Sequence, residues 1–273
     1  MADLSKVKNW IKDADSIIVT AGNGMAISEG LDILSEKNFD QDFPQIAKKY
    51  HVHTIADALD KKFDSWTETW LFWSKLINKY SINYKPSSTM KKLKKLLDDK
   101  DNFIATSTFG HFFEKAGFNS NRVFDAAGDW TVMQCSSGIN HGQKNDLDVV
   151  KKFMNADQNG NVVEDLVPRC DDCNSEMEIH VPLNAHFFPD TNANTRFRWF
   201  LTGNEDKKVV ILELGVDETS PQLLDPMIKL VEQFSNWKYV AADLTIDELP
   251  DDLAKRSFAL GENSEQLLVD LTN

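Results

Sequence analysis

Apolar runs recur along the chain and alternate with amphipathic segments. Apolar residues every third or fourth position over 4–13 predict a helix, and the apolar, β-branched run over 16–20 predicts the strand that follows it. Three further apolar runs each come after a helical segment, at 103–106, 209–214 and 239–244. Buried strands that alternate with helices predict an α/β fold with a Rossmann-like, doubly wound parallel sheet.

Two long segments, 33–84 and 135–200, do not keep this alternation. The first carries Trp66, Trp70 and Trp73 at helical spacing, which predicts a packed helical module. The second contains all three cysteines. We therefore expect a smaller domain from these two insertions, a helical module plus a cysteine-bearing module with a metal site or its remnant. The expected large domain comprises residues 1–32, 85–134 and 201–273.

The turn after the first strand is the most informative part of the sequence. Gly22 and Gly24 follow the apolar run and precede a predicted helix. Glycines let the backbone turn tightly and lie close to a pyrophosphate, while amides at the helix N-terminus point at the anion. Ile27 stands where the third glycine of the dinucleotide fingerprint belongs, so a plain strand-to-helix turn is the alternative. The turn indicates a nucleotide phosphate site.

Composition and charge narrow the classes of function. A chain of 273 residues with 41% apolar residues can bury a sizeable core, and a net charge of −13 argues against non-specific nucleic-acid or membrane binding. No stretch reaches the roughly 18 apolar residues of a membrane helix, and the N-terminus lacks a signal-peptide core, so we expect a cytoplasmic protein. Three cysteines, two of them spaced as Cys170-x-x-Cys173, suit a reduced compartment and a metal site better than disulfides.

Six ordered segments resemble the signature motifs of the sirtuin family. They lie at 22–32, 106–117, 122–128, 170–173, 213–216 and 241–244. The first resembles the family's Gly-Ala-Gly-x-Ser-x-x-x-Gly segment that ends in Asp, and the fourth resembles the second half of a zinc knuckle. In detail the motifs are most similar to those of the bacterial macrodomain-linked sirtuins, a branch known for protein ADP-ribosylation more than for deacylation.

The resemblance implies a mechanism whose side chains are missing here. In sirtuins an Asn and an Asp orient the nicotinamide ribose and the leaving group, and a His acts as general base. The matching positions are Thr108, Gly110 and Ala127, and an alanine neither abstracts a proton nor donates a hydrogen bond. The macrodomain-linked branch already lacks the His. His111, beside the lost Asp, is a candidate base with a capping or surface role as the alternative, and His186 is a second candidate.

The nucleotide half of the motifs is better preserved. Gly215 and Val216 can offer backbone amides to phosphate oxygens, and Asp243 stands where the family's adenosine-ribose Asn lies. Asp217 is unfavourable, because its carboxylate would lie near an anion. The residues that the resemblance assigns to NAD or ADP-ribose are Ala21, Gly22, Asn23, Met25, Glu29, Asp32, Ser107, Thr108, Phe109, Gly215, Val216, Asp217, Asp243 and Leu244.

The expected zinc site lacks one family ligand. Cys135, Cys170 and Cys173 match three ligands, but Ile139 stands where the partner of Cys135 belongs. His141 can take its place and complete a Cys3His site. The alternative is a site in which hydrogen bonds replace the metal, since three cysteines alone bind zinc incompletely. We expect partial or no metal occupancy.

We expect a sirtuin-like protein that binds NAD or ADP-ribose, is related to NAD-dependent protein ADP-ribosyltransferases and deacylases, and has reduced or no conventional catalysis. One alternative is an active transferase or deacetylase that uses non-standard residues, and another is a scaffold that keeps the fold without the ligand. The expected partners are the nucleotide and a protein substrate, with neither nucleic acid nor membrane. We expect Gly22 and Gly24 to matter for nucleotide affinity, because a β-carbon at Gly22 would push the phosphates away from the helix amides. We do not expect His111 to affect that affinity.

Overall fold

The larger sheet has six parallel strands in the order β3-β2-β1-β7-β8-β9. The computed structural model describes residues 4–182, 187–216, 220–242, 253–261 and 263–272. The strands are β1 (Ser16–Ala21), β2 (Asp101–Thr106), β3 (Val123–Asp125), β7 (Val209–Leu214), β8 (Lys238–Ala241) and β9 (Ser257–Ala259). Because the chain adds β2 and β3 on one side of β1 and β7 to β9 on the other, the strand order reverses between β1 and β7. The predicted doubly wound parallel sheet is confirmed.

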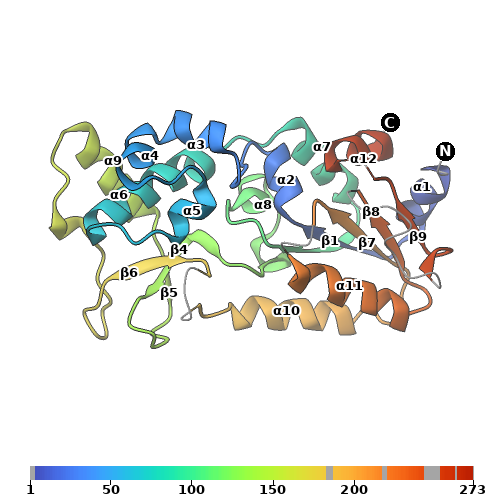
Figure 1. Ribbon diagram of the computed structural model, residues 1–273. Helices are drawn as coiled ribbons and strands as arrows, with labels where there is room; N and C mark the ends of the chain where they lie inside the picture. Colours follow the sequence, from blue (N-terminus) through green and yellow to red (C-terminus); the bar gives the residue numbers. More distant parts are fainter. Residues whose placement is uncertain (1–3, 183–186, 217–219, 243–252, 262, 273) are drawn as a thin grey trace.

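Helices cover both faces of this sheet (Figure 1). One face carries α1 (Leu4–Asp13), α2 (Asn23–Ser28), α7 (Ser88–Leu97) and α12 (Ser264–Thr272), and the other carries α10 (Thr191–Thr202) and α11 (Pro221–Gln233). Ile17 and Val19 belong to the first core and Ile18 to the second, because successive side chains of a strand point to opposite faces. The first strand is therefore buried on both sides, as its continuous apolar run predicts.

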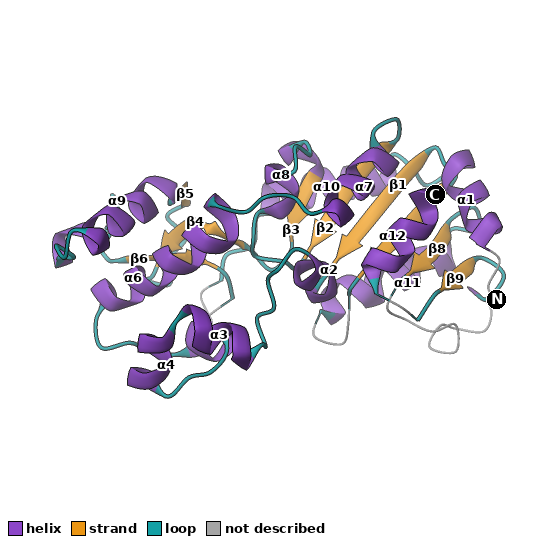
Figure 2. Cartoon of the chain, turned by 90° about the horizontal axis from the view of Figure 1, so that it is seen from above, coloured by secondary structure: helices purple, strands orange, loops and turns teal. Residues whose placement is uncertain are grey.

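A second, antiparallel sheet has three strands in the order β5-β4-β6. Its strands are β4 (Asp129–Cys135), β5 (Gln143–Asn145) and β6 (Met177–His180). Around it lie α3 (Glu36–Asp42), α4 (Pro44–Tyr50), α5 (Ile55–Asp60), α6 (Trp66–Ile77), the π-helical turn η1 (Asn78–Ile82) and α9 (Leu147–Gln158). Figure 2 shows this part beside the larger sheet. The short helix α8 (Phe112–Lys115) follows β2 in the chain.

The tryptophan-rich helix α6 is the centre of the helical module, as the sequence predicts. Trp70 and Trp73 are buried, and Trp66 packs on Trp73 at the edge of the core. The indole nitrogen of Trp70 donates a hydrogen bond of 2.8 Å to the carbonyl of Met177 in β6. Helix and small sheet thus share one core.

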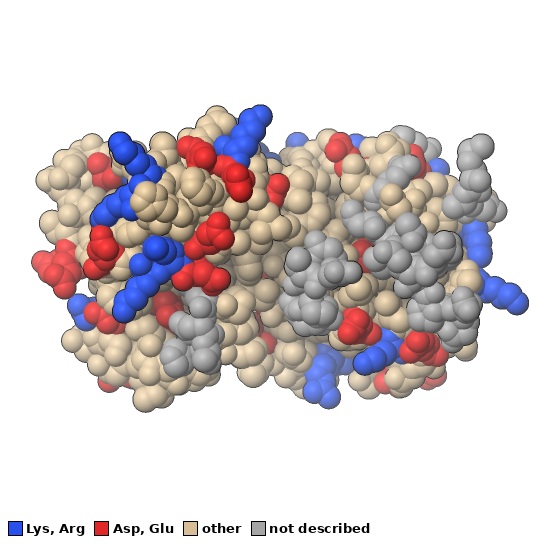
Figure 3. Space-filling view, in the orientation of Figure 1, with Lys and Arg blue, Asp and Glu red and all other residues tan. Residues whose placement is uncertain are grey.

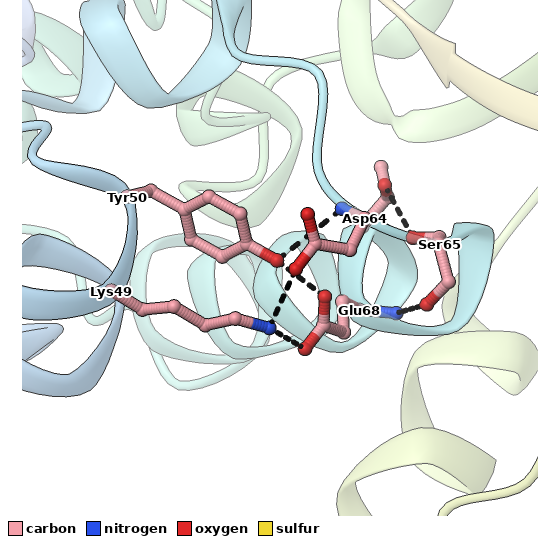
Figure 4. Close-up of polar contacts among 6 residues, drawn as sticks. Lys49, Tyr50, Asp64, Ser65 and Glu68 are labelled. Carbon is pink, nitrogen blue, oxygen red and sulfur yellow. Dashed lines mark hydrogen bonds and ion pairs between the residues drawn. The ribbon is translucent and has the colours of Figure 1, made fainter.

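Polar contacts join α4 to α6 at the surface of this module (Figure 4). The Lys49 ammonium pairs with the carboxylates of Glu68 and, at 2.9 Å, of Asp64. The Tyr50 hydroxyl donates to Glu68 and accepts a hydrogen bond from the backbone amide of Asp64. The hydrogen bond from Lys49 lowers the pKa of Glu68, so the carboxylate stays ionised next to the buried aromatic rings.

Two segments pack differently from the domain boundaries expected from sequence. α10, expected in the smaller domain up to residue 200, packs against β2 and β3 of the larger sheet. β4, expected in the large domain up to residue 134, belongs to the small sheet from Asp129 onward. We propose a boundary at 126–128 and a return near 190, with the other expected boundaries kept as predictions.

The face drawn in Figure 3 carries mixed charge where the helical module lies. Figure 3 shows acidic and basic side chains interspersed over the part that holds α3 to α6 and α9. No helix in the described ranges is both long enough and apolar enough to cross a membrane.

Candidate functional site

A pocket of about 190 Å³ opens at the carboxyl ends of β1 and β2. In open parallel sheets, ligands bind at this edge, where the strand order reverses. Its lining residues are Asn23, Ala26, Leu31, Ile33, Ser107, Thr108, Phe109, Ala127, Pro182 and Ser220. Five of them, Asn23, Ser107, Thr108, Phe109 and Ala127, are residues that the sequence assigns to the site, so three separate motifs meet in one cavity.

Hydrogen bonds fix the loop after β2 against β1. The Ser107 amide donates to the carbonyl of Ala21 at 3.0 Å, and the hydroxyls of Ser107 and Ser220 lie 2.8 Å apart. The Thr106 hydroxyl donates to the same Ala21 carbonyl at 2.9 Å and lies 2.8 Å from the Thr108 hydroxyl. A hydroxyl has one proton, so the Thr108 hydroxyl must be the donor to Thr106. Thr108 can therefore accept a hydrogen bond from a ligand but has no proton left to donate.

Packing within the protein requires glycine in this turn. The sequence analysis gave another reason, the close approach of the backbone to a phosphate. A β-carbon on Gly22 would lie 2.3 Å from the carbonyl oxygen of Gly215, so the residue must be glycine whether or not phosphate is present. Gly215 itself has φ +65° and lies against Gly24. The amide of Gly24 donates to Gly215 and that of Met25 donates to Gly22. These two amides do not point at an anion as the sequence suggests.

Several other predicted contact residues have their side chains engaged by protein. The Glu29 carboxylate accepts hydrogen bonds from the Tyr84 hydroxyl at 2.5 Å and from the Ser87 amide and hydroxyl, and so anchors the start of α7. Asp32 accepts the amide of Leu34 at 3.0 Å. The Met25 side chain is fully buried. A role in ligand contact stays a prediction for these three residues.

The two other catalytic positions differ from each other. Ala127 lines the pocket and is 8% exposed. A β-carbon on Gly110 would lie 2.3 Å from the ring of Phe112, which is buried and packs on the ring of Tyr84. The space of a side chain at 110 is thus filled by an aromatic ring.

No family model matches the chain, but two known proteins are similar to it over most of its length. The protein ADP-ribosyltransferase of Staphylococcus aureus is 26% identical over 270 residues, which cover 96% of this chain and 84% of that protein. A Fusarium oxysporum protein named probable bifunctional ADP-ribose hydrolase/ADP-ribosyltransferase is 25% identical over 237 residues, 81% of this chain but only 38% of that protein.

Solved structures give the fold. A Sir2 homologue in complex with NAD matches with a TM-score of 0.61 at 16% identity, covering 98% of this chain and 92% of that one. A Sir2 homologue variant with ADP-ribose matches with a TM-score of 0.60 at 17% identity, covering 100% and 95%. The chain has the sirtuin fold. The resemblance seen in the sequence is confirmed, and the names of the two relatives agree with the ADP-ribosyltransferase branch.

Within this sirtuin fold, His111 lies beside the pocket and not among its lining residues. Its φ of +58° is unusual for a residue with a side chain, and it precedes α8. Its Nδ1 lies 2.7 Å from Asp129 Oδ2, at the start of β4. Burial acts to lower the pKa of His111, but the hydrogen bond and charge of Asp129 outweigh it and the pKa is raised. The imidazole links the larger sheet to the smaller one.

Further carboxyl groups surround this pair. Burial raises the pKa values of Glu114, Asp125 and Asp146, the last to about 8. Asp146 is fully buried, and neither of its carboxyl oxygens has a hydrogen-bond partner in the described residues. It precedes α9 but does not cap it. The sequence analysis does not single out this acid, because an Asp before a helix is an ordinary N-cap signal that says nothing about burial.

The four candidate metal ligands of the sirtuin fold come together at the end of the small sheet. The ligand atoms of Cys135, His141, Cys170 and Cys173 all lie within 4.8 Å of one another. The sulfurs of Cys135 and Cys173 lie 3.4 Å apart, and so do Cys170 Sγ and His141 Nδ1. Zinc bonds of about 2.0–2.3 Å in a tetrahedron place ligand atoms about 3.5–3.8 Å apart, so the set fits zinc. Hydrogen bonds from Ser175 lower the pKa of the Cys173 thiol to about 6, which favours the thiolate that zinc binds.

Four predicted residues, Asp217, Asp243, Leu244 and His186, lie outside the described residues. Gly215 and Val216 directly follow β7 and lie next to the glycine turn, and Val216 is buried. The sequence analysis did not assign five of the pocket residues, Ala26, Leu31, Ile33, Pro182 and Ser220. Ala26 and Leu31 lie inside the first motif and Ile33 directly follows it, whereas Pro182 and Ser220 stand in no recognisable motif.

Proposed function

We propose that the pocket binds NAD or ADP-ribose and that conventional sirtuin catalysis is reduced or absent. The observation that carries the proposal is the meeting of Asn23, Ser107, Thr108, Phe109 and Ala127 in one cavity at the reversal of strand order. Two relatives are named for ADP-ribose chemistry, and two structural neighbours were solved with NAD and ADP-ribose. These names support the same ligand class for this chain.

The size and chemistry of the pocket suit one end of a dinucleotide. Its 190 Å³ is below the roughly 300–1,000 Å³ of a complete small-molecule site. Asn23 can donate and accept hydrogen bonds, and the Ser107 and Ser220 hydroxyls can meet ribose or amide groups. Leu31, Ile33 and Phe109 supply apolar walls that exclude water. A bound NAD would contribute a labile bond between nicotinamide and ribose.

The lost side chains support reduced catalysis. Ala127 cannot act as a base, Thr108 has no free proton to donate, and the Phe112 ring fills the space beside Gly110. Losing a general base typically removes about 10²–10⁴-fold in rate. Residual ADP-ribosyl transfer is the second candidate, because the names of the relatives favour it and because transfer depends largely on positioning and electrostatics.

Isothermal titration with NAD and with ADP-ribose tests the proposal. We expect binding by the wild type, and loss of binding in Ala127→Phe, whose ring would fill the cavity. Ala254→Phe is the matched control, because Ala254 is exposed and away from the pocket. Failure of the wild-type protein to bind either nucleotide at millimolar concentration would replace this proposal with the empty scaffold.

We also propose that Cys135, His141, Cys170 and Cys173 hold a structural zinc ion. The sequence leaves a Cys3His site and a metal-free site open, and the convergence of four ligand atoms supports the first. A site closed by four protein ligands leaves no position for a substrate. Its contribution is to hold the two cysteine-bearing turns at the end of the small sheet.

A further inference from the structure

Trp199 is the most exposed large apolar side chain in the described part of the chain. It is 73% exposed and projects from α10, whereas Phe197 and Phe200 on the same helix are buried. The next most exposed large apolar residue, Ile139, reaches 60%. Tryptophan exposes more apolar area than any other side chain, so its position on a surface points to a contact with another molecule.

The indole borders a hollow of about 430 Å³ between α10, the amino end of β2 and the turn η2 (Ser120–Arg122). We call this surface the Trp199 patch and define it by Arg122, Arg196, Trp199, Phe200 and Lys207. Phe103 and Phe200 form its apolar floor. The Arg122 guanidinium lies over the Phe200 ring, 5.1 Å from its centroid, which holds the charge at the rim.

The patch is positive on a chain whose net charge is −13. Three cations line the hollow against a single acid, Asp101, which pairs with Arg122 at 3.1 Å. Arg196 donates through Nε to the carbonyl of Asn121, and neither Arg196 nor Lys207 forms an ion pair with any residue in the described ranges. Their charges are available to a partner. Glu205 and Asp206 lie next to Lys207 in the chain but do not line the hollow.

The patch is separate from the nucleotide pocket. Asp101 begins β2 and Thr106 ends it, and the pocket-lining residues 107–109 follow that end. A six-residue strand spans about 20 Å, so the two sites lie at opposite edges of the sheet. The inference therefore stands whether or not the pocket binds a nucleotide.

We propose that the Trp199 patch docks an acidic segment of a protein partner. An apolar side chain of that segment packs on Trp199 and the phenylalanine floor, and its carboxylates meet Arg196 and Lys207. Trp and Arg are the residues that most often dominate binding energy at protein interfaces, while rim charges steer association. A nucleic acid would require a longer track of cations and several stacking rings, and the overall negative charge opposes it.

Fluorescence anisotropy with a labelled twelve-residue peptide tests the proposal. The probe carries Asp and Glu around a central Leu-Phe pair, and the comparison probes are the same peptide with Lys in place of each acid and a single-stranded oligonucleotide. We expect binding of the acidic peptide that weakens with salt. Trp199→Ala and Arg196→Glu should each weaken it about tenfold or more.

Val163→Ala and Lys61→Glu are matched controls, since Val163 is 52% exposed and Lys61 is an exposed cation, and neither lines the patch. Both should bind the peptide like the wild type, and all four variants should keep the wild-type melting temperature and nucleotide affinity. The proposal is overturned if the acidic peptide does not bind at millimolar concentration or if the Lys peptide or oligonucleotide binds as well. Self-association that Trp199→Ala abolishes, measured by light scattering, would also overturn it by making a second copy the occupant.

Discussion

The surroundings of Asp146 are unfavourable for a charged carboxylate. This residue is fully buried without a hydrogen-bond partner in the described part, and the negative charge of Asp129 adds to the burial that raises its pKa. The folded protein therefore holds this acid protonated up to about pH 8, whereas the unfolded chain ionises it near its ordinary value of 3.8. Such a group makes folding less favourable as pH rises.

Asp146→Asn should remove this pH dependence. Between about pH 4 and pH 8 the unfolded wild type binds one proton fewer at this site, so the free energy of unfolding falls by about 1.4 kcal/mol per pH unit and levels off above the folded pKa. The variant should gain on the wild type by that slope over this range. Urea unfolding of both proteins at pH 5, 6, 7 and 8 measures the difference, and a constant difference across these pH values would contradict it.

The glycine turn gives a second test at single residues. Gly22→Ala should lower the melting temperature, because its β-carbon would meet the Gly215 carbonyl at 2.3 Å. Overpacking of this kind costs about 1–3 kcal/mol. In the control Gly203→Ala the nearest contact is 3.2 Å and φ is −70°, so its effect should be smaller. Equal melting temperatures for the two variants would show that the turn relaxes freely.

Restoring the family's catalytic residues should meet a steric limit at Gly110. We expect no detectable lysine deacylation by the wild type, and robust acyl release from a peptide would refute this. Thr108→Asn with Ala127→His should keep the fold. Adding Gly110→Asp should lower the melting temperature, because the Phe112 ring fills that space. Thermal unfolding of the double and triple variants separates these effects.

At the scale of single residues, spacing identifies which positions meet but not what surrounds them. Asn23, Ser107 and Ala127, which come from three different motifs, line one pocket. Spacing cannot show that the Phe112 ring replaces a missing carboxylate or that the Glu29 carboxylate is engaged by Ser87, because both follow from packing between segments far apart in the chain.

At the scale of elements, two turns converge to make the cysteine cluster. Cys170 and Cys173 lie on a short turn closed by a hydrogen bond of 2.9 Å from the Asn174 amide to the Cys170 carbonyl, and Asn174 has φ +60°. Cys135 ends β4, and His141 lies before β5. The backbone hydrogen bond from the Ser136 amide to the Glu176 carbonyl, at 3.1 Å, holds the two segments together beside the cluster. A metal ion would add a direct restraint between the two turns.

Elemental analysis of protein purified without chelator measures how much zinc the cluster holds. Because the four ligand atoms converge, we expect close to one equivalent of zinc per chain, in place of the partial or absent occupancy expected from the sequence. His141→Ala should lower the occupancy. His180→Ala is the control, because His180 is a buried histidine on β6 that bonds to the Phe188 carbonyl and is not part of the cluster. Unchanged occupancy in His141→Ala would instead leave the site to the three cysteines and an external ligand.

Elements with continuous apolar sequence could be predicted, and others could not. β1, β7 and the second half of β2, residues 103–106, are buried on both faces and mostly apolar, and α1 has a clear helical pattern. β5 has the sequence Gln-Lys-Asn and is exposed, and β3 and β9 have three residues each, so no periodicity marks them. α10 is amphipathic, but its pattern does not say which sheet it covers.

At the scale of the whole molecule, the chain passes from one sheet to the other over Ala126, Ala127 and Gly128. Gly128 has φ +85°, and a β-carbon there would lie 2.1 Å from the carbonyl of His180. Only glycine lets β4 begin so close to β6. The hydrogen bond between His111 and Asp129 spans the same crossing, which joins the loop after β2 to the small sheet.

The connection between the two sheets also forms one wall of the pocket. Ala127 belongs to the connection, whereas Asn23 begins α2, which packs on the larger sheet. A rotation of the small sheet would therefore change the width of the cavity, and a molecule held between these walls would resist that rotation. By thermodynamic reciprocity, whatever fixes the angle between the sheets alters affinity by the same factor by which ligand binding biases that angle. The affinity of the pocket for its ligand would then depend on the angle between the two sheets.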